Sequence, residues 1–275
     1  MDVMKSIELS ELKKLVLDVK ETYGYDFSDY AVSSLQRRII RFMNLQSIDT
    51  VKNLVYRLIG DEVFFKQFVL EITVNTTEMF RDPTMWTILK DKILPGLKDL
   101  ETIRIWHAGC SSGEEVYSMC ILLEEEGLLD KAKIYATDLN EVVMEKAKQG
   151  KYSLRNMKLN SENYIKYGGK EALDKYCSVD TEYIIMNKDL LKNVSFKRFD
   201  LATEHEPFLK FDIIMCRNVM IYFNNTLQDK LIELFKNSLF AKAILVVGAQ
   251  ETIKMSTVGD AFSIVDEREK IFALK

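Results

Sequence analysis

Polar side chains follow apolar, strand-like runs at three places in this chain. They occur in segments 105–115 (IWHAGCSSGEE), 136–140 (ATDLN) and 211–223 (FDIIMCRNVMIYF). In the third segment, a buried strand is predicted to end on Arg217 and Asn218. Ligands of open α/β sheets bind outside the carboxyl ends of the strands. The three segments therefore predict one ligand site at one edge of a sheet.

The loop in the first segment carries Gly109 and Gly113, followed by Glu114 and Glu115 at the expected start of a helix. Small residues let a ligand approach the backbone. A dinucleotide site would show Gly-x-Gly-x-x-Gly and bind pyrophosphate at the helix N-terminus. Two carboxylates there would repel phosphate and suit an amino group or a sulfonium. As an alternative, the two glutamates only interact favourably with the helix dipole.

The second segment places Asp138 at the tip of a strand. A carboxylate in that position can accept hydrogen bonds from two ribose hydroxyls. It can also cap the helix that is expected from Asn140, and the two roles are compatible. Asp138 provides an acid for the ribose, whereas the loop of the first segment lacks the pattern that binds phosphate. Together these features favour S-adenosylmethionine over NAD as the ligand.

Strands and helices must alternate to bring these segments together, and from residue 101 onward they do. Strands are predicted at 102–108, 132–137, 194–199, 211–216 and 243–248, and helices at 113–127, 140–149 and 225–239. This alternation predicts an α/β fold of the Rossmann-like type, with a parallel sheet covered by helices on both faces. Residues 261–266 and 269–274 are predicted to form an antiparallel hairpin.

Two further regions differ from this pattern. Residues 1–74 show helical spacing of apolar residues and contain no proline, which predicts a small all-helical N-terminal domain. The α/β domain is predicted at 75–275. Within it, about 160–192 breaks the alternation and is predicted to be a small inserted β-subdomain.

Composition narrows the class of protein. The chain has 275 residues, 47% hydrophobic content and a net charge of -4, so charge alone gives no case for nucleic acid or membrane binding. No apolar run is long enough to span a membrane. With two histidines and four cysteines without paired spacing, no metal site is expected. These features predict a reduced, soluble protein of the cytoplasm.

Four blocks of sequence resemble the chemotaxis receptor methyltransferase (CheR) family. They are 75–83 (NTTEMFRDP), 112–118 (SGEEVYS), 136–138 (ATD) and 211–223, in the family's order and spacing. The resemblance covers nearly the whole chain, and the last block is highly specific. It implies a helical domain, a methyltransferase domain, and transfer of methyl groups from S-adenosylmethionine to glutamate side chains of methyl-accepting chemotaxis receptors.

The resemblance also implies site residues, which are carried over by position. The cofactor contacts it implies are Asn75, Thr77, Arg81, Glu115, Asp138, Asp200, Leu201, Arg217 and Asn218. Arg81 and Tyr222 lie where the family's active-site residues cluster. Two positions depart from the family pattern: Val116 replaces a common proline, and Asp200 replaces a common asparagine, so that it can accept but not donate hydrogen bonds.

The reaction implied by the resemblance needs no general base, because a glutamate carboxylate is already ionised at neutral pH. Arg81 can hold the incoming carboxylate, or it can pair with a nearby acid of the protein. Tyr222 can close the pocket, or it can be a buried aromatic at a strand end. A cofactor-binding sensor without catalysis and a small-molecule methyltransferase remain as alternative functions.

A basic face on the helical domain predicts a partner surface. Arg37, Arg38 and Arg41 share one side of a predicted helix, opposite the apolar residues Leu35 and Ile39. This is the charge expected for docking on acidic receptor helices, although arginine clusters are often only solvated. The protein is expected to act as a monomer.

Overall fold

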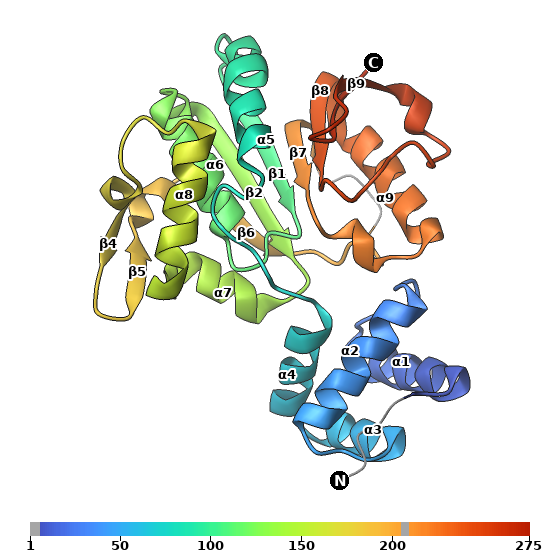
Figure 1. Ribbon diagram of the computed structural model, residues 1–275. Helices are drawn as coiled ribbons and strands as arrows, with labels where there is room; N and C mark the ends of the chain where they lie inside the picture. The colour runs from blue at the N-terminus through green and yellow to red at the C-terminus, as the bar shows by residue number, and fades with distance from the viewer. Residues whose placement is uncertain (1–5, 205–208) are drawn as a thin grey trace.

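The computed structural model describes residues 6–204 and 209–275 (Figure 1). Residues 1–5, which belong to the predicted helical domain, lie outside the described residues. The described part of residues 1–74 forms the helices α1 (Leu9–Tyr23), α2 (Val32–Leu45), α3 (Val51–Gly60) and α4 (Glu62–Ile72). The apolar faces of α1 and α2 are buried, although Leu9 at the start of α1 is exposed. The small all-helical N-terminal domain is therefore confirmed.

The main sheet has seven strands in the order β6-β2-β1-β7-β8-β10-β9. The parallel strands are β1 (Ile103–Ala108), β2 (Ala132–Asp138), β6 (Val194–Arg198), β7 (Phe211–Cys216) and β8 (Leu239–Val247). Strands β9 (Phe262–Asp266) and β10 (Ile271–Leu274) pair antiparallel, which confirms the predicted tail hairpin. The α/β class with a mainly parallel sheet is thus confirmed.

Strand β8 begins at Leu239, four residues earlier than the 243 predicted. Helix α9 (Asn225–Ser238) leads directly into it. The pairing with β7 then shifts register between Phe211 and Ile213, and Lys242 adopts a left-handed backbone at φ 63°. This irregular start interrupts the apolar run, so the sequence pattern does not predict the first residues of the strand.

Alternation along the strands produces two apolar cores. Ile103 and Ile105 of β1 face one core, and Trp106 faces the other. Helices α5 (Pro83–Ile88) and α6 (Glu114–Glu125) cover the first face. Helix α9 covers the second face, and the core there is continuous with that of the N-terminal helices. The helical domain is therefore packed onto the sheet domain.

A second, three-stranded antiparallel sheet forms the inserted subdomain. Its strands are β3 (Lys151–Ser153), β5 (Tyr183–Met186) and β4 (Cys177–Val179), in that order, and β3 follows α7 (Glu141–Gln149) and precedes residue 160. Helix α8 (Met157–Tyr167), which the sequence pattern did not predict, packs beside α5. It was missed because Asn160 and Asn163 occupy buried positions, where their side chains bond to the backbone of Met79.

The loop before α2 joins the two domains. The amide of Ala31 donates to the carbonyl of Tyr222 at 2.9 Å, and the amide of Asn224 donates to the carbonyl of Asp29 at 2.9 Å. The side chains of Asn224 and Asp29 are also hydrogen-bonded, at 3.0 Å. The helical domain therefore contacts the same loop that carries the third polar segment of the sequence.

Candidate functional site

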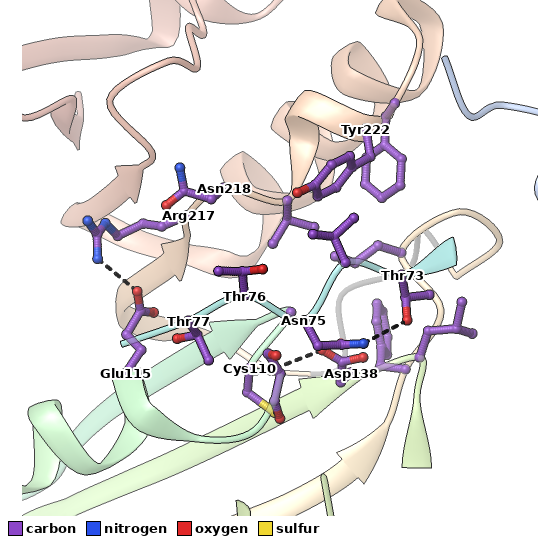
Figure 2. A pocket seen from close by; sticks show the side chains of 18 of the residues that line it. Thr73, Asn75, Thr76, Thr77, Cys110, Glu115, Asp138, Arg217, Asn218 and Tyr222 are labelled. Carbon is purple, nitrogen blue, oxygen red and sulfur yellow. Dashed lines mark hydrogen bonds and ion pairs between the residues drawn. The ribbon is translucent and has the colours of Figure 1, made fainter. Parts of the chain in front are cut away.

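A pocket at the carboxyl edge of the sheet brings the predicted site residues together. All nine residues proposed for the cofactor, and Tyr222, line it. Figure 2 shows Glu115 with Arg217 toward one end of this pocket and Asp138 with Thr73 toward the other. The segment with Asn75, Thr76 and Thr77 passes between them. Segments far apart in the sequence thus form one site, as the strand-end argument predicted.

Asp138 ends β2 with both carboxylate oxygens hydrogen-bonded to backbone amides. Oδ2 accepts from Ser111 at 2.8 Å and Oδ1 accepts from Asn140 at 2.9 Å. Burial raises the pKa of Asp138, and these amide bonds oppose the rise. The helix cap is Asn140, whose side chain accepts from Val142. The capping role considered for Asp138 is therefore wrong, and the carboxylate is left facing the pocket.

Glu115 forms the other charged end. Its Oε1 lies 2.9 Å from Nδ1 of His107 and its Oε2 lies 2.9 Å from Nη1 of Arg217. Nη2 of Arg217 also donates to Asp82 Oδ2 at 2.6 Å and to the carbonyl of Arg81 at 3.2 Å. Burial alone would raise the pKa of Glu115, but the His107 hydrogen bond and the Arg217 charge together lower it.

Its neighbour Glu114 behaves differently. Glu114 does not line the pocket and is buried against Ser112, whose hydroxyl donates to it at 2.7 Å. Burial raises the pKa of Glu114 to about 7. The Ser112 hydrogen bond and the charge of Lys146 oppose this rise without cancelling it. Of the two glutamates that start α6, only Glu115 can contact a ligand in this pocket.

The backbone around Arg81 is held in an unusual conformation. Phe80 and Asp82 both have positive φ, at 50° and 55°. The ring of Phe80 is fully buried and stacks on Tyr167 at 4.7 Å, while Trp86 Nε1 donates to the Arg81 carbonyl at 3.0 Å. Left-handed non-glycine residues persist where packing over-determines them, and they cluster at functional sites.

The Arg81 side chain, in contrast, is loosely held. Its guanidinium makes one long hydrogen bond, of 3.4 Å, to the carbonyl of Thr76. No acidic side chain in the described part of the chain forms an ion pair with it. The alternative of a structural ion pair for Arg81 is therefore not supported, and its charge is available to an anion.

Tyr222 lies between Arg81 and the helical domain. The guanidinium of Arg38 lies 5.1 Å from the centre of its ring. Burial raises the pKa of Tyr222, and the charges of Arg38 and Arg81 oppose this. Of the other predicted docking arginines, Arg37 is exposed and Arg41 pairs with Glu71 at 2.9 Å. None of the three lines the pocket.

Several polar atoms of the pocket have no partner in the described structure. Asp200 is buried; its Oδ1 accepts from Ala202 at 2.9 Å, but its Oδ2 has no partner among the described residues. The same holds for Oγ of Ser111 and Nε of Arg217. Leu201, Leu139 and Phe199 supply apolar walls. Such atoms are normally satisfied, so they indicate where a polar ligand belongs.

Glu251 and Tyr30 are among the residues at the site that sequence reasoning missed. Glu251 is buried after β8, and its carboxylate accepts from the backbone amides of Asn218, Val219 and Ile221 and from Gly248. Glu251 follows the end of β8 at the same edge of the sheet, so the strand-end argument could have predicted it. Tyr30 reaches the pocket from the helical domain, where no local pattern marks it.

Comparison with family models now decides the family. The SAM binding domain of CheR methyltransferases matches residues 75–271, and the all-alpha domain of CheR methyltransferases matches residues 10–73. The chain belongs to the CheR methyltransferase family. S-adenosylmethionine is accordingly its cofactor, and the resemblance noted in the sequence is confirmed.

Several CheR relatives are similar over nearly their full length. Cher3 of Pseudomonas putida is 38% identical over 95% of this chain and 96% of its own. The chemotaxis protein methyltransferase of Listeria monocytogenes is 32% identical over 86% of this chain and 87% of its own. The chemotaxis protein methyltransferase of Borreliella burgdorferi is 31% identical over 90% of this chain and 90% of its own. This CheR protein therefore aligns with most of the length of each of these relatives.

The pocket fits the CheR cofactor in its chemistry. The ribose hydroxyls and the adenine amino group of S-adenosylmethionine are donors, and Asp138 and Asp200 present carboxylate oxygens that can accept. The sulfonium and ammonium groups are positive, and Glu115 is negative there. Within the described ranges, no helix is long and apolar enough to cross a membrane, and no cluster of metal ligands occurs.

Proposed function

We propose that this CheR protein transfers the methyl group of S-adenosylmethionine to glutamate side chains on the cytoplasmic domains of chemotaxis receptors. The products would be glutamate methyl esters and S-adenosylhomocysteine. The observation that carries this proposal is the Arg81 guanidinium, which lines the cofactor pocket without an acidic partner in the described residues. A free cation beside the cofactor site is suited to hold an incoming carboxylate.

The cofactor would be held along the length of the pocket. Asp138 would accept from the ribose hydroxyls, and Asp200 with Leu201 would enclose the adenine. Glu115 would accept from the ammonium group, since each of its oxygens has a second lone pair. Arg217 and Asn218 would complete this end, and Asn75 and Thr77 would contact the cofactor from the segment that crosses the pocket.

Bound S-adenosylmethionine supplies a methyl group on a positively charged sulfur. Arg81 would fix the acceptor carboxylate, and Tyr222 would close the pocket and exclude water. Removing water favours the step, because an anion and a cation combine and both charges disappear. Alignment of the reacting atoms within about 3–3.5 Å would supply much of the remaining rate. No proton has to be removed, so no general base is required.

The receptor would dock on α2. Arg37 and Arg41 are exposed on this helix, while Arg38 packs on Tyr222 and connects the docking face to the acceptor end of the pocket. Surface charges affect the association rate and its salt dependence more than affinity. Reversal of Arg37, Arg38 and Arg41 to Glu should slow methylation at low salt and leave cofactor affinity intact. Unchanged turnover at low salt would reject the docking role.

One assay tests the proposal as a whole. Full-length protein is incubated with S-adenosylmethionine tritiated in the methyl group and with a receptor cytoplasmic fragment. The expected product is a base-labile label on the receptor fragment, absent when its acceptor glutamates are changed to glutamine. Cofactor binding without label would favour a non-catalytic sensor, and label on small molecules alone would favour a small-molecule methyltransferase.

The proposed setting is the cytoplasm, where receptor signalling domains lie, and the proposed state is a monomer. A single chain supplies every residue assigned above to the cofactor and the acceptor, which supports the monomeric state. Light scattering during turnover should give the mass of one chain. Activity that appears only with dimer formation would contradict it.

A further inference from the structure

Tyr30 is the part of the helical domain that enters the cofactor pocket. It lines the pocket together with Asp138 and Asp200, although it lies on the loop before α2. Its side chain is only 9% exposed. A residue this buried, at the junction of two domains and facing a ligand site, can form part of that site.

The ring of Tyr30 is held rigidly. It packs edge-on against Phe27 and Phe223, with ring centres 5.1 Å apart in both cases. Its backbone forms a bridge with Phe223 in the sheet domain. A side chain fixed on both sides presents its hydroxyl in one place, so little entropy is lost when that hydroxyl binds a ligand.

No hydrogen bond of this hydroxyl occurs within residues 6–204 and 209–275. It nevertheless lies close to two carboxylates. The pKa of Tyr30 is raised above its usual range, first by burial and then by the negative charges of Asp200 and Asp138. The phenol therefore stays protonated and acts as a donor.

The cofactor needs a donor at this place. Asp138 and Asp200 can only accept, so they serve the ribose hydroxyls and the adenine amino group. The ring nitrogens of adenine are acceptors and require the opposite. We propose that the Tyr30 hydroxyl donates a hydrogen bond to an adenine ring nitrogen, so that the helical domain completes the adenosyl site. This inference rests on the assignment of the pocket made above.

Two tyrosine-to-phenylalanine variants of the full chain form a matched pair. Tyr30→Phe removes a hydroxyl that has no protein partner among the described residues. Tyr23→Phe removes a hydroxyl that lies away from the pocket and donates to the Leu58 carbonyl at 2.7 Å. We expect Tyr30→Phe to weaken S-adenosylhomocysteine binding about three- to tenfold in calorimetry, with ligand-free stability unchanged. Tyr23→Phe should lower stability and leave binding unchanged.

The outcomes separate this inference from the proposed function. If the wild type binds S-adenosylhomocysteine and Tyr30→Phe binds it equally well, the Tyr30 contact is wrong and the pocket assignment stands. Equal binding by Tyr30→Phe with weaker binding by Tyr30→Leu would reduce Tyr30 to an apolar wall, which also overturns the proposal. If the wild type does not bind, both the pocket assignment and the contact fail.

Ligand analogues identify the atom. The 1-deaza, 3-deaza and 7-deaza analogues of S-adenosylhomocysteine each lack one ring acceptor. For one of them, the affinity difference between wild type and Tyr30→Phe should disappear, because both partners of the bond are then missing. A difference that persists with all three analogues would contradict donation to the ring.

Discussion

The groups assigned to the cofactor and the group assigned to the acceptor are held in opposite ways. The cofactor groups Asp138 and Glu115, toward opposite ends of the pocket, have both oxygens engaged by amides, His107 or Arg217. Arg81, assigned to the acceptor, has a tightly fixed backbone but a guanidinium with a single long hydrogen bond. The comparison indicates that the cofactor groups are organised before binding, whereas the acceptor end keeps one charge uncompensated for the substrate.

Removing the charge at the acceptor end should have the largest effect. We expect Arg81→Ala to lower methyl transfer by about 10²–10³-fold, the cost of losing one preorganised donor at a reacting centre. S-adenosylhomocysteine affinity should fall less than about tenfold, because Arg81 is one of several cofactor contacts. Tritium transfer and calorimetry measure the two effects. Equal losses in the rate of methyl transfer and in S-adenosylhomocysteine affinity would contradict a role of Arg81 in holding the acceptor. Arg81→Lys keeps the positive charge and should recover part of the rate.

Among the groups assigned to the cofactor, the loss should appear in the free energy of unfolding. The Arg217 side chain is 2% exposed and pairs with Glu115 and Asp82. Arg217→Met would leave these carboxylates without their cation, at a cost of about 3 kcal/mol in the free energy of unfolding. The matched control is Arg268→Met, which removes an exposed arginine that pairs with Glu269 at the longer distance of 3.6 Å and should cost less than about 0.5 kcal/mol. Similar losses in urea denaturation would contradict the role of the buried pair.

Glu114 and Glu115 sharpen the comparison by their pH dependence. The pKa of Glu114 rises from 4.5 to about 7 on folding because the group is buried. The folded state therefore binds this proton more tightly, so the contribution of Glu114 to stability is most favourable below about pH 4.5 and is lost as the pH rises to about 7. Glu114→Gln should be more stable than wild type by about 2 kcal/mol at pH 8, with a smaller gain at pH 5.5.

The control for this experiment is Glu124→Gln, an exposed position on the same helix. Its stability difference from wild type should not change between pH 5.5 and pH 8. If Glu114→Gln has the same small, pH-independent effect in urea denaturation, the carboxylate of Glu114 is not destabilised by burial.

Glu251 should have the smallest of these effects. It acts on the loop that carries Asn218, Val219 and Ile221. A glutamine there keeps one acceptor oxygen and turns an amide toward backbone N–H groups, including that of Asn218. We expect Glu251→Gln to weaken S-adenosylhomocysteine binding about tenfold. Glu267→Gln, an exposed carboxylate nearby, is the control. Unchanged binding with normal stability would show that the loop holds its shape without Glu251.

The strand ends and the helical domain could be predicted because alternation and helical spacing are local properties of sequence. The buried helix α8 could not, because buried Asn160 and Asn163 are read as polar surface residues. Tyr30 was also beyond reach, since its position depends on how the two domains pack. Glu251 could have been found by applying the strand-end rule to β8 as it was applied to β1, β2 and β7.

Calorimetric titration of the full-length wild type and of Asp138→Ala with S-adenosylhomocysteine tests the account most directly. We expect one site per chain in the wild type and an affinity at least about tenfold lower in the variant, because two ribose hydroxyls lose a charged acceptor. Equal affinities for the two proteins, or a wild type that binds NADH or ATP in preference to S-adenosylhomocysteine, would contradict it.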